Sequence, residues 1–236
     1  MTVIPTPRRH LNLLAIETST ELCSAALLRG DELFDEEIRA PNQHAEQLAP
    51  MIRRLLARAD LAIAALDAMA FGQGPGSFTG LRIACGIAQG LAFGAGRPVI
   101  PVPSLLALAE QAGAPRVVAA LDARMGETYF AAYSRTADDW ESVIAPALFA
   151  QDALPPLPGS DWVATGSGFD AFDWLRAAYA GQVKANVADD LPRAAAVARL
   201  AGRRLARGEF VAAEDAAPLY LRDKVALTTR ERQAAR

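Results

Sequence analysis

Residues 71–82 read FGQGPGSFTGLR, and this stretch says more about the fold than any other. It contains four glycines and follows an apolar run, residues 66–71. A helix rich in small residues is expected after it, over residues 77–94. Glycines in such a turn let backbone amides approach closely either a phosphate or another backbone segment. The first case would indicate an ATP-using enzyme, and the second a protein that keeps only the fold of one.

The loop does not match the usual phosphate-binding motifs. A Walker loop ends in Gly-Lys-Ser/Thr, whereas here the helix opens with Ser-Phe-Thr-Gly-Leu-Arg. A dinucleotide-binding loop has the pattern Gly-x-Gly-x-x-Gly, but Gly72 and Gly74 are followed by Ser77 in place of the third glycine. The residues favour a sharp strand-to-helix turn over a nucleotide site, without excluding the nucleotide site.

The hydrophobic pattern around the loop predicts an α/β fold. Apolar runs separated by turns predict an antiparallel meander of three strands, and spacing of i, i+3, i+4 predicts an amphipathic helix after it. The expected elements are strands at 11–16, 22–28, 33–38, 66–71 and 99–102, with helices at 44–59, 77–94 and 104–111. This β-β-β-α-β-α-β order is that of a ribonuclease-H-like lobe.

A second, weaker round of the same pattern begins near residue 116. Its expected elements are strands at 117–121, 127–133 and 162–165 and helices at 169–180 and 192–207. The sequence therefore predicts two lobes with mixed sheets, at residues 11–104 and 105–225. Flexible segments are expected at residues 1–10 and 226–236.

Composition limits the classes of function. The chain has 236 residues, 52% of them hydrophobic and 22% charged, and a net charge of −3, which gives no general attraction to nucleic acid or membrane. Cys23 and Cys85 lie in apolar segments, so we expect no disulfide scaffold and a cytoplasmic protein. The N-terminus lacks the apolar core of a secretory signal. The longest apolar stretch, residues 83–96, is glycine-rich and short for a membrane span.

The helix after the loop carries a stripe of glycines. Gly86, Gly90 and Gly94 recur every four residues, beside a stripe of alanines. Each glycine costs about 1 kcal/mol relative to alanine in a helix, so a compensating close contact is expected. That contact could lie within the chain or with another subunit, and the sequence leaves both open.

Catalytic residues are hard to assemble from this chain. The two histidines, His10 and His44, have no carboxylate or cysteine at ligand spacing, and no Gly-x-Ser-x-Gly elbow is present. Glu17 and Asp122 could hold magnesium-bound phosphate at strand ends, but each also has an ordinary role in its turn. We expect no catalytic, cofactor-binding or metal-binding residues.

Several motifs, taken in order, resemble the TsaB (YeaZ) family of the bacterial machinery that makes threonylcarbamoyladenosine in tRNA. They are LLAIETSTELCSAALL, QHAEQLAPMI, GQGPGSFTGLR, PVIPVPSL, LDARMGETYFAAY and APLYLRDKVA, which span residues 11–225. The resemblance implies an actin-like ATPase-domain (ASKHA) fold with two ribonuclease-H-like lobes.

The resemblance also implies a function and partners. Members of this family act as non-catalytic scaffold or activator subunits of TsaD, which transfers threonylcarbamoyl to the adenosine next to the anticodon of tRNAs reading codons that start with A. The resemblance further implies that a small ATPase, TsaE, joins the complex and that tRNA is bound through the complex. A homodimer is possible, and no cofactor is implied. TsaD carries a His-x-x-x-His pair after its Pro-Val strand, and the matching residues here are Ser104 and Leu108.

By the same resemblance, the partner surface lies on two helices of the first lobe. Its expected residues are His44, Leu48, Met51, Leu55, Leu81, Gly86, Gly90 and Gly94. The alternative function is that of an independent ATP-dependent small-molecule kinase, with Glu17 and Asp122 placed around ATP-magnesium. A metallopeptidase is least favoured, because the chain has no histidine pair. The sequence leaves open whether tRNA or nucleotide touches this chain, and what residues 140–161 and the basic tail from Arg222 do.

Overall fold

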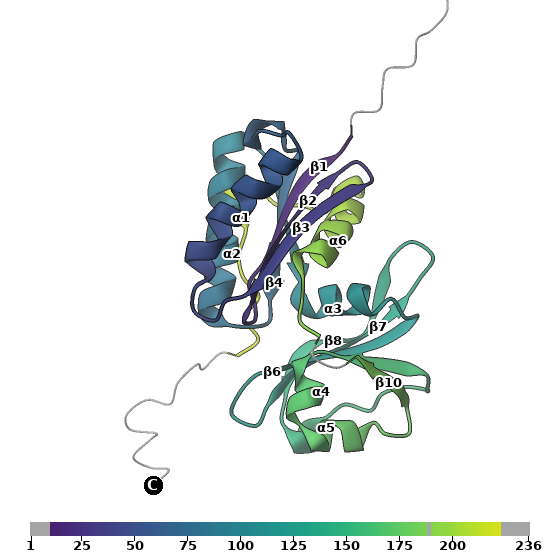
Figure 1. Ribbon diagram of the computed structural model, residues 1–236. Coiled ribbons are helices and arrows are strands. Elements are labelled where there is room, and N and C mark those ends of the chain that lie inside the picture. Colours follow the sequence, from purple (N-terminus) through teal and green to yellow (C-terminus); the bar gives the residue numbers. More distant parts are fainter. Residues whose placement is uncertain (1–9, 188–189, 223–236) are drawn as a thin grey trace, which may run out of the picture.

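The protein consists of two lobes, each built on a five-stranded mixed sheet (Figure 1). The computed structural model describes residues 10–187 and 190–222. The segments expected to be flexible, residues 1–10 and 226–236, lie outside the described residues apart from His10.

The first sheet has the strand order β3-β2-β1-β4-β5. Strands β1 to β3 form an antiparallel meander, and β4 and β5 run parallel to β1. The strands are β1 (Asn12–Glu17), β2 (Leu22–Arg29), β3 (Glu32–Arg39), β4 (Ala68–Gly74) and β5 (Val99–Pro103).

The second sheet repeats this arrangement as β8-β7-β6-β9-β10. Strand β6 pairs antiparallel with β7 and parallel with β9, as β1 does with β2 and β4. The strands are β6 (Arg116–Asp122), β7 (Thr128–Arg135), β8 (Trp140–Phe149), β9 (Trp162–Thr165) and β10 (Val183–Val187). The predicted α/β fold with two ribonuclease-H-like lobes is confirmed, and both sheets share one topology.

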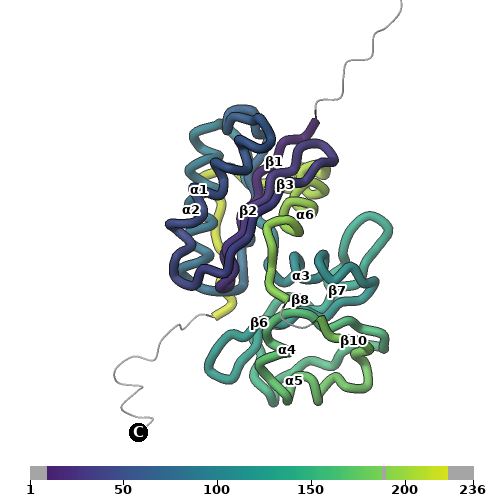
Figure 2. Tube along the Cα trace, viewed as in Figure 1, coloured from purple at the N-terminus to yellow at the C-terminus, as the bar shows by residue number. Residues whose placement is uncertain are grey.

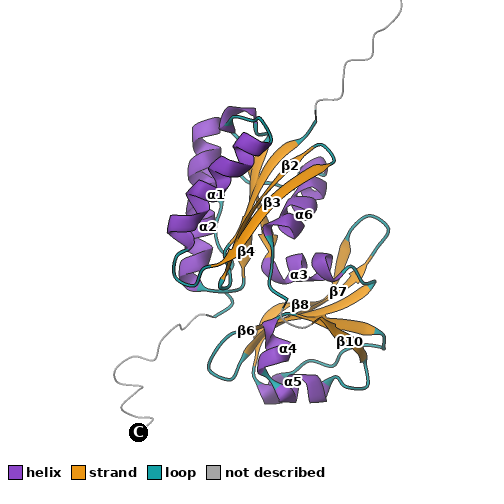
Figure 3. Cartoon of the chain, viewed as in Figure 1, coloured by secondary structure: helices purple, strands orange, loops and turns teal. Residues whose placement is uncertain are grey.

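Helices cover both faces of the first sheet (Figure 3). Helices α1 (His44–Arg58) and α2 (Phe78–Ala95) lie on one face, and α6 (Ala194–Ala206) packs on the other, against β1 and β2. Helix α3 (Ser104–Ala112) lies between the lobes and contacts strands of both. In the second lobe, the single helix expected at 169–180 is two short helices, α4 (Ser167–Ala171) and α5 (Asp173–Ala178), because Phe172 is extended between them.

The end of the chain returns to the first lobe, and here the structure differs from the expected division at residue 105. Helix α6 covers the first sheet, Val211 pairs with Val99, and the Leu219 amide donates to the Gln73 carbonyl at 2.7 Å. Figure 2 shows this yellow segment running beside α2. An apolar helix face does not itself specify which of two similar sheets it covers, so the order of elements could not place α6.

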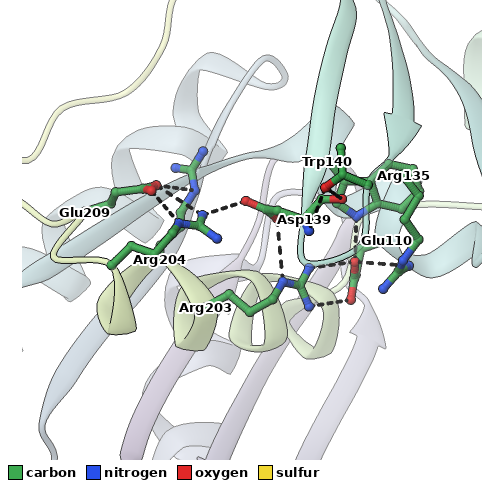
Figure 4. Close-up of polar contacts among 9 residues, drawn as sticks. Glu110, Arg135, Asp139, Trp140, Arg203, Arg204 and Glu209 are labelled. Atoms are coloured by element: carbon green, nitrogen blue, oxygen red, sulfur yellow. Dashed lines mark hydrogen bonds and ion pairs between the residues drawn. The ribbon is translucent and has the colours of Figure 1, made fainter.

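An ionic network ties the lobes together on the side of α6 (Figure 4). The guanidinium of Arg203 in α6 donates to both carboxylate oxygens of Glu110 in α3, at 3.1 and 2.8 Å. The indole of Trp140, at the start of β8, donates to the same carboxylate at 2.7 Å. Arg135 lies 3.7 Å from it, and the side chain of Glu110 is only 6% exposed. This carboxylate therefore joins the first-lobe helix α6 to the second-lobe hairpin.

Candidate functional site

The glycine loop brings two backbone segments together. A Cβ added at Gly76 would lie 2.4 Å from the Ser19 carbonyl oxygen, and one at Gly80 would lie 1.9 Å from that of Thr18. The Ser77 amide donates to the Ser19 carbonyl at 2.7 Å, and the Thr18 hydroxyl donates to the Gly80 carbonyl at 2.8 Å. These glycines thus allow the start of α2 to lie against the turn after β1. Of the two possibilities left open by the sequence, backbone contact is the one observed.

Glu17 is part of this junction and is fully buried. Its carboxylate accepts a hydrogen bond from the Ser19 amide at 2.6 Å and another from the Ser104 hydroxyl at 2.8 Å. Burial raises the pKa of the Glu17 carboxyl above its ordinary value, although these hydrogen bonds oppose the rise. Gly72 lies directly against it, since an added Cβ would be 1.8 Å from Oε2. Glu17 is thus enclosed by protein atoms, which disfavours its expected alternative role in binding magnesium-bound phosphate.

A cleft of about 450 Å³ opens between the lobes next to this junction. Its charged lining side chains are Glu21 and Asp122, which are acidic, and Arg124, which is basic. Asp122 accepts a hydrogen bond from the Arg124 amide at 2.7 Å and pairs with its guanidinium at 3.2 Å. His44 points its Nε2 at the Thr20 carbonyl, 2.9 Å away. One arginine facing two carboxylates is a poor match for a nucleoside triphosphate.

Metal binding finds no support in the described part of the chain. Within residues 10–187 and 190–222, no three His, Cys, Asp or Glu side chains gather closely enough to hold a metal ion. The two residues that match the histidine pair of TsaD do not form a metal site either. The Ser104 hydroxyl is hydrogen-bonded to Glu17, and the Leu108 side chain is apolar and buried in the core.

Five of the eight expected interface residues are buried within this chain. The five are His44, Leu48, Met51, Leu55 and Leu81. Their side chains already pack inside this chain, which leaves little surface for a partner, and their role as contact residues stays a prediction. Leu48, Met51 and Leu55 follow the helical periodicity, which marks the side of a helix facing its own sheet as readily as a side facing a partner.

The three glycines of α2 face outward. A Cβ added at Gly86, Gly90 or Gly94 would meet nothing within 4 Å, whereas the neighbouring stripe of Ala84, Ala88 and Ala92 is buried. Close packing among the described residues therefore does not explain the glycines. The only large residue on this face near the helix end is Phe93, which is 78% exposed and was missed from the sequence although it lies three residues after Gly90.

Helix α2 is unusually apolar for a helix that is so little covered. By length and composition alone, it is the one helix among the described residues that could cross a membrane, and a third of it is buried inside the protein. In the structure it packs against β4. Its outward face, defined here as Gly86, Gly90, Phe93 and Gly94, is exposed and uncharged, and the neighbouring Ile83 and Ile87 are half-buried against the core of the first lobe.

Comparison with known proteins gives consistent matches. The family model described as "TsaD: tRNA N6-adenosine threonylcarbamoyltransferase" matches residues 38–229. The Escherichia coli "tRNA threonylcarbamoyladenosine biosynthesis protein TsaB" is 38% identical over 230 residues, covering 92% of this chain and 96% of that protein. The Haemophilus influenzae protein of the same name is 38% identical over 234 residues, with the same coverage.

Solved structures agree with the sequence matches. YeaZ from Pseudomonas aeruginosa superposes with a TM-score of 0.79 at 41% identity, covering 89% of this chain and 100% of that one. A second Pseudomonas aeruginosa structure, described as an uncharacterized protein with similarity to peptidase YEAZ, gives 0.83 at 41% identity, covering 90% and 100%. With nearly full-length coverage and a shared two-lobe fold, the chain belongs to the TsaB (YeaZ) family.

Proposed function

We propose that this chain is a scaffold and activator subunit in the formation of threonylcarbamoyladenosine in tRNA. It pairs with a catalytic TsaD-type subunit, which modifies the adenosine next to the anticodon of tRNAs reading codons that start with A. The names of the relatives and the TsaD family model support the pathway. The pairing is inferred from the geometry of α2.

One observation carries the pairing: the outward face of α2 contains three glycines, and no described residue lies within 4 Å of a Cβ added at any of them. Glycines without a compensating contact would cost the helix about 1 kcal/mol each. A second helix lying across Gly86 and Gly90 would supply that contact, because the missing side chains allow two helix axes to approach closely. Phe93 would then be covered as well. A homodimer through this face is the resting form we propose.

The chain itself contributes no catalytic group in this proposal. Glu17 is enclosed and Asp122 is paired with Arg124, so neither is free to hold a nucleotide-bound metal in the described structure. The TsaD-type subunit catalyses the transfer, and a TsaE-type ATPase joins the complex. The assembled complex binds tRNA and acts in the cytoplasm.

The pairing is tested by filling the glycine positions. Gly86→Leu and Gly90→Leu place bulky side chains where a partner helix would lie, and each should reduce the affinity for the TsaD-type subunit by at least about tenfold. Gly181→Leu is the matched control, because Gly181 is also exposed and open but lies in the second lobe. Affinity is measured by surface plasmon resonance, with circular dichroism to verify folding. Unchanged affinity in both α2 variants would refute the pairing through this face.

The biochemical role is tested by reconstitution. Threonylcarbamoyl transfer to tRNA by the TsaD-type subunit should depend on this chain, and transfer that proceeds equally without it would overturn the role. Titration of the isolated chain with ATP-magnesium addresses the alternative kinase. We expect no micromolar binding, because the cleft offers one arginine against two carboxylates.

A further inference from the structure

A compact aromatic and arginine cluster lies at the first turn of α2. The guanidinium of Arg82 stacks over the ring of Phe78, 3.7 Å from its centroid, and its Nε donates to the Tyr220 hydroxyl at 2.9 Å. The rings of Phe78 and Tyr220 are 5.4 Å apart and tilted by 35°. Tyr220 belongs to the C-terminal segment, so this cluster joins residues 138 positions apart in sequence.

The second lobe adds an exposed methionine beside the cluster. Arg124 and Met125 both have positive φ, 64° and 58°, in the turn between β6 and β7. Arg222 supports this turn by donating to the Ala123 carbonyl at 3.0 Å and by pairing with Glu127 at 2.7 Å. A left-handed conformation at two consecutive non-glycine residues is unfavourable without such support. The turn leaves Met125 69% exposed.

Phe78, Met125 and Tyr220 line one groove of about 230 Å³ across the junction of the lobes, and Arg82 contacts the two aromatic side chains. Phe78 and Tyr220 are 40% and 43% exposed, so the groove combines two aromatic rings and a methionine, all open to solvent. Exposed aromatic residues, methionine and arginine are the residues enriched in protein–protein interfaces. Arg82 links this groove to the outward face of α2, because it contacts Phe78 and Tyr220 and precedes Gly86 and Gly90 at the same four-residue spacing.

Arg82 has an incomplete set of partners. Among residues 10–187 and 190–222, no carboxylate pairs with it, and its one hydrogen bond to protein uses Nε. The contacts with Phe78 and Tyr220 hold the guanidinium in place, and no residue in the described ranges forms a hydrogen bond with its two terminal nitrogens. A guanidinium held flat in this way is suited to bind a carboxylate through two parallel hydrogen bonds.

We propose that Phe78, Arg82, Met125 and Tyr220 form a second anchor point for the TsaD-type subunit proposed above. An apolar side chain of the partner enters the groove between the rings and Met125, and a neighbouring aspartate or glutamate of the partner binds Arg82. This inference rests on the proposed pairing and adds the second lobe and the C-terminal segment to its surface.

The charges at the groove favour a protein over an RNA. The two arginines that line the groove are both paired, Arg124 with Asp122 and Arg222 with Glu127. Arg82, which contacts Phe78 and Tyr220 beside it, forms no ion pair with an acidic side chain among the described residues. Single-stranded nucleic acid is bound by a row of unpaired cations and by open aromatic faces. Here one face of Phe78 is covered by Arg82 itself.

The test measures affinity between this chain and the TsaD-type subunit from the same organism. Arg82→Glu should raise the dissociation constant at least tenfold, and Arg82→Lys, which keeps the charge but loses the planar fork, should raise it by a smaller factor. Tyr220→Ala should weaken binding as well. The matched control is Arg199→Glu on α6, an exposed arginine on the opposite side of the first sheet. Arg82→Gln repeats the test if Arg82→Glu does not fold.

The outcomes separate this inference from the proposed function. If the natural chain binds the partner and the Arg82 variants bind equally well, the anchor is refuted while the pairing stands. If Arg82→Glu leaves subunit affinity unchanged but weakens tRNA binding by the assembled complex, the groove is an RNA contact and the proposal is overturned. If the natural chain shows no binding, the pairing fails and the anchor fails with it.

Discussion

Glu110→Gln tests whether the ionic network in Figure 4 stabilises the arrangement of the two lobes. Glutamine keeps the size of the side chain and one acceptor oxygen, but it removes the charge and presents an N–H₂ group to Arg203. The paired hydrogen bonds from Arg203, at 3.1 and 2.8 Å, are therefore lost or weakened. Hydrogen bonds to a charged group contribute about 1.5–3 kcal/mol each, and the remaining acceptor offsets part of that. We expect a loss of about 2 kcal/mol in the free energy of unfolding.

The assay is thermal unfolding by differential scanning calorimetry. For a chain of this size, a loss of 2 kcal/mol corresponds to a decrease in Tm of about 4–8 °C. Glu209→Gln is the control from the same region, because Glu209 is far more exposed than Glu110 and its ion pair with Arg207 is open to solvent. An exposed pair contributes about 0–1 kcal/mol, so this variant should melt close to the natural protein.

The pH dependence of the difference identifies its origin. Burial alone would raise the pKa of Glu110, but the hydrogen bonds from Arg203 and Trp140 lower it below the ordinary value of 4.5. Because the pKa of Glu110 is lower in the folded state, its carboxylate stabilises the fold at pH values above the ordinary pKa. This contribution is lost as the pH falls through the folded-state pKa. The difference between the natural chain and Glu110→Gln should thus be full at neutral pH and shrink in acid. Equal Tm values at neutral pH for Glu110→Gln and Glu209→Gln would refute the reasoning.

Two further variants test the junction beneath the glycine loop. Burial raises the pKa of Glu17, so the stability that its protonated form gives the fold is lost as pH rises. Glu17→Gln should therefore be more stable than the natural chain at alkaline pH and equally stable in acid. A Tm difference of the opposite sign would contradict this. Gly72→Ala should destabilise the chain by about 1–3 kcal/mol, because the added Cβ would lie 1.8 Å from the enclosed Glu17 carboxylate. Gly181→Ala, which meets no neighbouring atom, serves as its control in the same denaturation experiment.

Most strands and helices could be predicted from the sequence, and those that were missed share a physical reason. Strands β8 and β10 are the edges of the second sheet, and their residues are mostly half-buried or exposed. An edge strand with few buried side chains lacks the apolar alternation on which prediction depends. The strands β1 and β6 are the central strands of their sheets, are almost fully buried, and were therefore recognisable as apolar runs.

The candidate surface was predictable only in part. The glycine stripe at Gly86, Gly90 and Gly94 is visible in the sequence because three glycines in one helix require an explanation. Phe93 and the cluster of Arg82 with Tyr220 were not found. Tyr220 reaches Arg82 only because α6 carries the chain back to the first lobe.

The sequence by itself determined the two-lobe α/β fold, the family and the absence of a recognisable phosphate loop, because these depend on local periodicity and on motifs with fixed spacing. The tertiary structure decided which side of each helix faces outward. It placed Leu48 and Met51 in the core and Gly86 and Gly90 at the surface, although all four have helical spacing. It also showed that the loop at residues 71–82 binds the turn after β1, since contact between two backbones depends on their positions in space and leaves no distinctive pattern in the sequence.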